Sequence, residues 1–194
     1  CEEGRGEGEK TIGTHRGNPG LCRGGGGKRS MIYLGLGTNL GNRIHNLRRA
    51  LNLLREHIAI TTISSVYDSA PMYITDQPRF YNMVVECSTD LSAVELLQVC
   101  KDVERAVGRG KGRRYGPRVM DVDILLYHDA RLSICKPELE IPHPAMLSRA
   151  FVLLPLAEIN STLIHPVTGR KCVEYLAALN ADIKKLGGLY ETHC

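Results

Sequence analysis

Residues 107–126 read VGRGKGRRYGPRVMDVDILL, in which a glycine-spaced cationic segment runs directly into an apolar, β-prone segment. The positive charges are those of Arg109, Lys111, Arg113, Arg114 and Arg118. The apolar segment carries Asp121 and Asp123, which on a strand point to one face, roughly 7 Å apart. Cations bind phosphate oxygens, and carboxylates hold Mg²⁺ against phosphates. The stretch therefore predicts a site for a phosphorylated ligand and a metal.

Each half of this stretch also has a simpler interpretation. Two acidic residues can lie on a solvated strand face, and a basic run can be a solvated loop. However, Val122 and Ile124 indicate an interior strand, where paired carboxylates without a counter-charge are costly. The glycines between the basic residues let a backbone approach a ligand and keep such a loop mobile. These neighbours favour the functional interpretation.

Composition limits the classes of protein to consider. With 194 residues, 43% hydrophobic and 24% charged, the chain has the size and balance of one globular domain. A net charge of +4 is too small to indicate nucleic-acid binding. No apolar run approaches the roughly 18 residues of a membrane span, and no secretory signal is visible. We expect a cytoplasmic protein and leave an organellar location open.

Seven cysteines without a C-x-x-C pair favour reduced thiols over disulfides or zinc.

Three segments differ in composition. Residues 1–30 are rich in glycine and charge, and we expect a disordered tail or linker. Residues 31–182 form the expected folded domain, and residues 183–194 are expected to be a frayed terminus.

Hydrophobic periodicity predicts a βαββαβ order in the folded part. The strands are expected at 31–38, 60–67, 80–89 and 120–127, and the helices at 43–57 and 93–107. This order is that of a ferredoxin-like α+β sandwich. The C-terminal additions are a hairpin at 134–141, short helical turns at 146–158 around Pro155, and a closing helix at 172–179.

The two phenylalanines can be interpreted in two ways. Phe80 opens the third expected strand, and Phe151 follows a segment with His143 and Arg149. Composition alone favours core positions for both. The other interpretation is a pair of flat walls around a planar heteroaromatic ring.

Several spaced motifs resemble one family. The run Y-G-P-R-x-x-D-x-D-I-L at 115–125 is similar to the signature of the 6-hydroxymethyl-7,8-dihydropterin pyrophosphokinase family. Further similarities, in the same order as in that family, are LGLGTNL at 34–40, SAP at 69–71, QP-x-F-x-N at 77–82, E-x-x-x-GR at 104–109, IPHP at 141–144 and R-x-F at 149–151. The resemblance covers about residues 31–179.

The resemblance implies a diphosphokinase of tetrahydrofolate biosynthesis, which transfers pyrophosphate from ATP to the hydroxymethyl group of the dihydropterin. It implies two Mg²⁺ on Asp121 and Asp123, and catalytic roles for Arg109, Arg118, Asp121 and Asp123, with Arg109 on a closing loop. The implied ATP contacts are Glu104, Arg114, Tyr115, Arg118, Ile124, His143 and Arg149. The implied pterin contacts are Gly37, Ser69, Ala70, Met72, Phe80, Asn82 and Phe151, with the two phenylalanines on either side of the ring. The implied partners are ATP and the pterin, with a link or fusion to other folate enzymes, and neither nucleic acid nor a membrane.

The chain departs from the family in places: Tyr115 stands where many relatives have Trp, and Ala70 where some have Pro. Two alternatives stay open. A ferredoxin-like RNA-binding module would need exposed aromatics on its sheet, a pattern that the strands do not show. A non-catalytic relative would not need the Asp121 and Asp123 pair together with Arg118.

Overall fold

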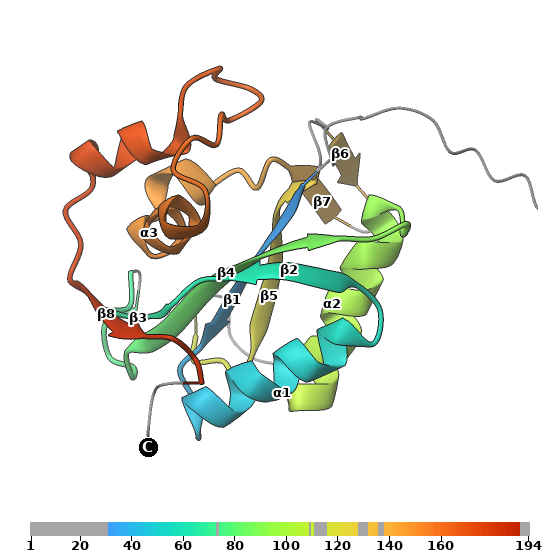
Figure 1. The fold of residues 1–194 in the computed structure, drawn as a ribbon. Coiled ribbons are helices and arrows are strands. Elements are labelled where there is room, and N and C mark those ends of the chain that lie inside the picture. The colour runs from blue at the N-terminus through green and yellow to red at the C-terminus, as the bar shows by residue number, and fades with distance from the viewer. Residues whose placement is uncertain are drawn as a thin grey trace, which may run out of the picture.

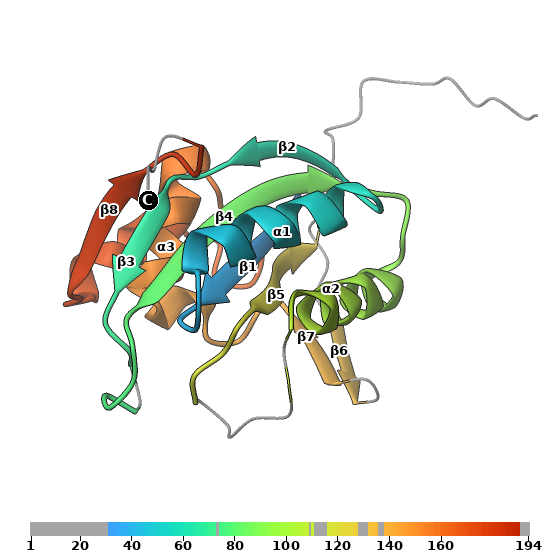
Figure 2. The ribbon, with the colours of Figure 1, turned by 90° about the horizontal axis from the view of Figure 1, so that it is seen from below.

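A six-stranded sheet with helices on both faces forms the body of the protein (Figures 1 and 2). The structure is a computed structural model that describes residues 31–72, 74–108, 110, 116–127, 132–135 and 138–190. Helices α1 (Arg43–Arg55) and α2 (Ala93–Val107) cover one face, and α3 (Ala150–Ile159) covers the other. The α+β class predicted from the sequence is confirmed.

The strand order of the sheet is β5-β1-β4-β3-β8, and β2 also pairs with β4. The strands are β1 (Ile32–Thr38), β2 (Ala59–Ile63), β3 (Val66–Ser69), β4 (Phe80–Ser88), β5 (Asp121–Tyr127) and β8 (Ile183–Gly187). All of these pairings are antiparallel. Strand β1 therefore lies between β4 and β5, which brings residues far apart in sequence into one surface.

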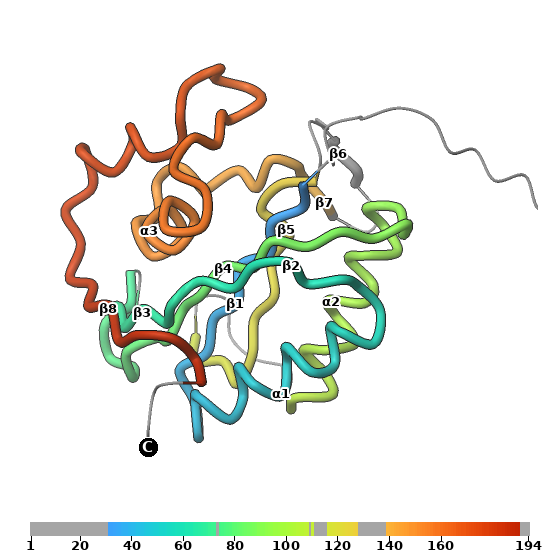
Figure 3. Tube along the Cα trace, viewed as in Figure 1, coloured from blue at the N-terminus to red at the C-terminus, as the bar shows by residue number. Residues whose placement is uncertain are grey.

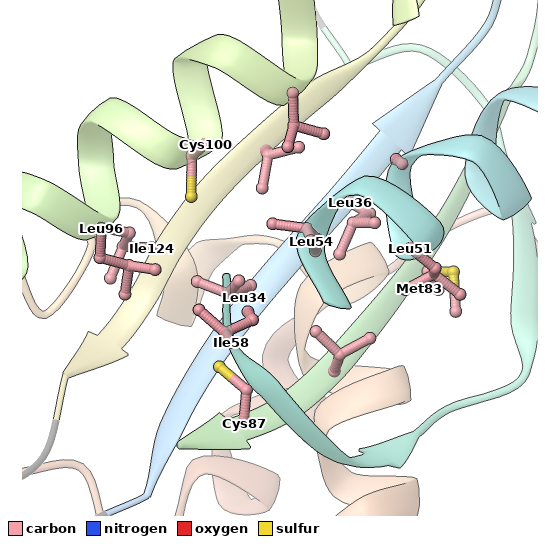
Figure 4. Packing of buried hydrophobic residues seen from close by; sticks show 14 of the residues in the cluster. Leu34, Leu36, Leu51, Leu54, Ile58, Met83, Cys87, Leu96, Cys100 and Ile124 are labelled. Carbon is pink, nitrogen blue, oxygen red and sulfur yellow. The ribbon is translucent and has the colours of Figure 1, made fainter. Parts of the chain in front are cut away.

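Alternation along β1 separates two layers of packing. Leu34 and Leu36 point to α1 and α2 and belong to the larger core, whose side chains are shown in Figure 4. Tyr33 belongs to a second buried cluster, formed with α3. Residues two apart on a strand share a face, so Gly35 and Gly37 lie on the α3 face with Tyr33. That face of β1 has no side chain at these two positions, which leaves room beside the second cluster.

Both long helices begin at the predicted residues, and α2 also ends at the predicted residue, whereas α1 ends at Arg55, two residues before the predicted end. Asn42 caps α1 by accepting a hydrogen bond from the backbone N–H of His45. Ser92 and Glu95 form a reciprocal capping box at the start of α2. Helix α2 ends at Val107, and its C-cap is Gly108, whose φ of 121° is readily adopted by glycine.

The strand expected at 60–67 is in fact two strands, β2 and β3. Between them the Ser64 hydroxyl accepts a hydrogen bond of 2.9 Å from the backbone N–H of Val84. The Ser64 N–H in turn donates to the carbonyl of Val84. The Ser64 hydroxyl thus takes the place of a backbone carbonyl as the acceptor for the Val84 N–H. The backbone hydrogen bonding of this segment to β4 is therefore interrupted at Ser64.

The prediction of short helical turns at 146–158 is also partly wrong. A short 3₁₀ helix, η1 (Met146–Ser148), is followed by α3, which continues through Pro155. Val152, Leu153 and Leu156 are buried against the sheet, and this burial outweighs the local cost of the proline. The expected hairpin at 134–141 is confirmed as β6 (Leu132–Cys135) paired with β7 (Glu138–Ile141). The closing helix is a 3₁₀ helix, η2 (Cys172–Ala178).

The expected frayed segment at 183–194 is ordered over Ile183–Gly187. Ile183–Gly187 form β8, which pairs with β3 at the edge of the sheet (Figure 3). The edge of β3 supplies hydrogen-bond partners for the backbone of β8, and the local sequence of β8 does not predict this pairing. Residues 191–194 and the tail at 1–30 lie outside the described residues. Among the described helices, none is both long and apolar enough to cross a bilayer.

Candidate active site

Two rows of residues cross β5, β1 and β4 on the face that carries α3. Asp121, Gly37 and Asn82 form one row, and Asp123, Gly35 and Val84 form the next. The glycines lie in the middle of each row. A Cβ added to Gly37 would come within 3.2 Å of Asn82 Oδ1, and one added to Gly35 within 3.3 Å of Leu125. The glycines therefore create a trough between the carboxylates and β4.

This trough is the floor of a cavity of about 250 Å³. The cavity brings together most of the residues proposed from the sequence. Its lining includes all seven expected pterin residues, Gly37, Ser69, Ala70, Met72, Phe80, Asn82 and Phe151, and five expected phosphate or metal residues, Arg118, Asp121, Asp123, His143 and Arg149. Pieces of β1, β3, β4, β5 and α3 thus meet at one site.

Five expected residues are not part of this lining. Arg109, Arg114 and Tyr115 lie outside the described residues. Glu104 is buried beneath β5, where its Oε1 accepts a hydrogen bond of 2.9 Å from the backbone N–H of Val122. Ile124 packs in the core beside α2. The roles proposed for these five residues stay predictions.

The two carboxylates of the site, Asp121 and Asp123, influence each other's ionisation. Arg118 forms an ion pair with Asp121. Burial, followed by the charge of Asp121, raises the pKa of Asp123 to about 6. A group that resists ionisation beside another carboxylate favours a bound cation. No group of three His, Cys, Asp or Glu side chains within the described part is placed to hold a metal. Two carboxylates completed by ligand oxygens suit Mg²⁺, which is usually bound by one or two carboxylates and substrate phosphates.

His143 and Arg149 lie beside these carboxylates. His143 Nε2 is 4.0 Å from Asp123 Oδ2, and its Nδ1 accepts a hydrogen bond from the backbone N–H of Ala145. Burial and the neighbouring Arg149 lower the pKa of His143, so the ring is neutral and points an Nε2–H into the cavity. Arg149 Nε is buried and has no hydrogen-bond partner among the described atoms. A buried guanidinium donor without a partner is suited to an anionic ligand.

The same cavity also has features that suit a flat polar ring. Phe80 and Phe151 both line it, and the Arg149 guanidinium lies 5.7 Å from the centre of the Phe151 ring. Asn82 Nδ2 donates a 2.8 Å hydrogen bond to Ser69 Oγ, which fixes the amide between β4 and β3. An oriented amide in a cavity that two aromatic rings also line can bind the hydrogen-bonding edge of a heterocycle.

Sequence reasoning did not single out Asn39, which links the two halves of the cavity. Its Nδ2 donates to Gln77 Oε1 at 3.1 Å and to the Pro78 carbonyl at 3.0 Å. Its Oδ1 accepts from the backbone N–H of Arg118 at 2.7 Å. The available signal was its place in the G-T-N turn after β1. The lining residues that sequence reasoning did not assign to the site are Gly35, Leu36, Gln77, Met83, Val84, Gly116, Leu125 and Val152, several of which are recognised only from strand register.

Comparison with known proteins agrees with this geometry. Residues 33–161 match the model of the family described as 7,8-dihydro-6-hydroxymethylpterin-pyrophosphokinase (HPPK). The chain is 44% identical over 132 residues to 2-amino-4-hydroxy-6-hydroxymethyldihydropteridine pyrophosphokinase of Bacillus subtilis, covering 67% of this chain and 78% of that protein. It is 45% identical over 141 residues to the mitochondrial folate synthesis bifunctional protein of Arabidopsis thaliana, covering 69% of this chain and 25% of that protein.

Solved structures share the fold at lower identity. A Plasmodium falciparum HPPK-DHPS crystal structure with pteroate superposes with a TM-score of 0.65 at 17% identity, covering 78% of this chain and 44% of that one. The chain also spans only 20–31% of the length of three larger folate synthesis proteins that it matches.

Proposed function

The chain belongs to the 7,8-dihydro-6-hydroxymethylpterin-pyrophosphokinase family, and we propose that it performs that family's reaction. It transfers a pyrophosphoryl group from ATP to the hydroxymethyl group of 6-hydroxymethyl-7,8-dihydropterin and releases AMP and the pterin diphosphate. The reaction belongs to tetrahydrofolate biosynthesis.

One observation carries the proposal. A single cavity joins two neighbouring carboxylates on β5 to a slot with two phenylalanines and a fixed amide. A site for phosphate alone would not need the slot, and a site for a heterocycle alone would not need the carboxylates. Transfer between a nucleotide and a flat ring needs both.

The chain's own residues bind and orient the reactants. Phe80, Phe151 and Asn82 hold the pterin so that its hydroxymethyl oxygen faces the carboxylates. Arg118 and Arg149 bind phosphate oxygens of ATP, as forked donors do. The new bond joins the hydroxymethyl oxygen to the β-phosphorus, the bond from that phosphorus to the α–β bridging oxygen breaks, and AMP keeps the bridging oxygen. The hydroxyl proton leaves to solvent.

Positioning and charge account for the rate in this scheme. Asp121 and Asp123 would hold Mg²⁺, two ions in our proposal, which supplies positive charge to the phosphate oxygens and acidifies a coordinated hydroxyl. Arg109, Arg114 and Tyr115 are proposed to close over the nucleotide, with Arg109 contacting phosphate. Glu104 and Ile124 are proposed to border the adenosine.

Three finer points are also proposals. The strand order supports a ferredoxin-like core, since the segments 121–127, 32–38, 80–88 and 59–69 lie in the order 4-1-3-2 of the four expected strands. A functional link to other folate enzymes is supported by the bifunctional relatives. A cytoplasmic location is proposed from the sequence, with an organellar one as the alternative because the Arabidopsis and pea relatives are named as mitochondrial.

The test is the identity of the nucleotide product. Purified protein is incubated with Mg²⁺, ATP and 6-hydroxymethyl-7,8-dihydropterin, and nucleotides are separated by chromatography. The proposal expects AMP in equal amount to pterin diphosphate, and none without the pterin. Formation of ADP would indicate single-phosphoryl transfer, and absence of turnover would indicate a non-catalytic relative.

A further inference from the structure

The C-terminal segment lies outside the region that matches the family model, and it contacts a loop that contributes to the pocket. That match ends at residue 161, whereas β8 begins at Ile183 and lies along β3 at the sheet edge (Figures 2 and 3). Asp182 immediately precedes β8. Its backbone carbonyl accepts hydrogen bonds from the N–H of Ala70 at 3.2 Å and from Arg79 Nη2 at 3.3 Å. Its carboxylate pairs with Arg79 Nη1 at 2.5 Å.

Ala70 and Arg79 are the two ends of one loop. We call residues 70–79, between β3 and β4, the pocket loop. It contributes Ala70, Met72 and Gln77 to the cavity lining. Arg79 also forms an ion pair through Nε with Asp68, the residue of β3 just before Ser69. One residue of the C-terminal segment therefore contacts both ends of the pocket loop, and Arg79 connects it to β3.

We propose that Asp182 is a positioning residue for the pterin half of the site, acting as a clamp across the base of the pocket loop. This assignment rests on the proposed function for the identity of the ligand. Asp182 and Arg79 are substantially exposed, with 73% and 38% of their side chains accessible, so each ion pair alone stabilises the fold little. The effect of the clamp lies in ordering the pocket loop before the pterin arrives, which lowers the entropic cost of binding.

The second ion pair of β8 provides a matched control. Lys185 Nζ pairs with Glu158 Oε1 at 3.0 Å, and this contact joins β8 to α3. Neither Lys185 nor Glu158 lines the cavity. Loss of this ion pair weakens the attachment of β8 while leaving the contacts at the base of the pocket loop in place.

The experiment compares Asp182→Ala, Arg79→Ala and Lys185→Ala with the wild type. Pterin affinity is measured by calorimetry in the presence of Mg²⁺ and α,β-methylene-ATP, and nucleotide affinity is measured without pterin. We expect Asp182→Ala and Arg79→Ala to weaken pterin binding by roughly three- to tenfold, with nucleotide affinity unchanged. Lys185→Ala should lower the melting temperature and leave pterin affinity at the wild-type value.

Hydrogen exchange separates failure of the clamp from failure of the proposed function. Exchange of the pocket loop, including the Ala70 amide, is measured without any ligand. The clamp predicts faster exchange there in Asp182→Ala and not in Lys185→Ala. Unchanged exchange, or equal losses of pterin and nucleotide affinity, would overturn it. A wild-type protein that binds no pterin would refute the proposed function, while the exchange result would still decide whether the clamp exists.

Discussion

Asp123 ionises less readily than an ordinary aspartate, because burial and the neighbouring Asp121 raise its pKa to about 6. A neutral amide of the same shape removes that unfavourable charge together with one ligand for a cation. We therefore expect Asp123→Asn to reduce AMP formation by a factor on the order of a thousand or more, while its melting temperature without metal is no lower than that of the wild type. Steady-state assays and calorimetry measure the two quantities.

The control for this variant is Asp90→Asn, which removes a carboxylate exposed to solvent ahead of α2. It should retain wild-type turnover. If Asp123→Asn formed AMP at a rate near that of the wild type, the assignment of the carboxylate pair would be wrong.

Asn39 links the pterin half of the cavity to the phosphate half through one side chain. Asn39→Asp replaces the donor to Gln77 and Pro78 with an oxygen, but keeps an acceptor for the Arg118 N–H. Asn39→Ala removes both the donor to Gln77 and Pro78 and the acceptor for the Arg118 N–H. We expect the Asp variant to raise mainly the KM for the pterin, by about tenfold, because unmatched buried groups cost about 1–3 kcal/mol. The Ala variant should also lower kcat, because the backbone of Arg118 loses its support.

Asn160→Ala is the comparison for a lost asparagine contact outside the cavity, since Asn160 donates to Tyr33 Oη at 2.9 Å. Its KM values should match those of the wild type. Equal kinetic effects from Asn39→Ala and Asn160→Ala would mean that Asn39 acts only on stability.

At the scale of elements, Glu158 of α3 connects that helix to β3, to β8 and to the segment between β2 and β3. It accepts hydrogen bonds from the Ser65 N–H and hydroxyl, from Tyr67 Oη and from Lys185 Nζ. Burial alone would raise the pKa of Glu158, but these donors outweigh burial and lower it. We expect Glu158→Gln to reduce the free energy of unfolding at neutral pH by about 1–3 kcal/mol.

The pH dependence follows from the direction of that shift. A carboxyl with a lowered pKa in the folded state stabilises the fold above its ordinary pKa, and this contribution is lost as pH falls through the folded value. The difference between wild type and Glu158→Gln should therefore shrink below about pH 4. Denaturant titrations across pH measure it. Glu174→Gln, which breaks an exposed pair with Arg170, should have little effect at any pH.

Elements with strong local signals were predicted well, and those that depend on a distant partner were not. The apolar periodicity at 93–107 predicted the start of α2 correctly, and the structure shows that Ser92 caps it. Strand β8 has the sequence IKKLG, whose two lysines suggest a solvated tail, and it becomes a strand only because β3 offers an open edge. The bend at Ser64 likewise depends on Val84, twenty residues away in the chain.

The same distinction applies to the cavity. Asp121 was identified because its residue type and its neighbours suggest metal and phosphate binding, and Phe80 was assigned to the pterin only through the family resemblance. Gly35, Val84 and Leu125 line the cavity without any such signal, because their positions follow from how β1 pairs with β4 and β5. The pairing register between strands that are far apart in sequence cannot be predicted from a local sequence pattern.

At the scale of the whole molecule, the cavity lies where separate parts of the chain converge, from Gly35 of β1 to Val152 of α3. A ligand that contacts all of these parts binds only the folded state and so stabilises it. With Mg²⁺, α,β-methylene-ATP at about a hundred times its Kd should raise the melting temperature by about 5–10 °C. Differential scanning fluorimetry measures the shift.

Removal of the metal tests which part of the site holds the nucleotide. Because Asp121 and Asp123 repel phosphate unless a cation lies between them, EDTA should abolish most of the shift produced by the nucleotide. In Asp123→Asn the shift should depend less on Mg²⁺, since the amide neither repels phosphate nor binds the cation. Adenosine, which lacks phosphates, should give a small shift that EDTA does not change. If the nucleotide shift survived EDTA in the wild type, the phosphates would be held by the cationic side chains alone, and the carboxylate pair would need another role.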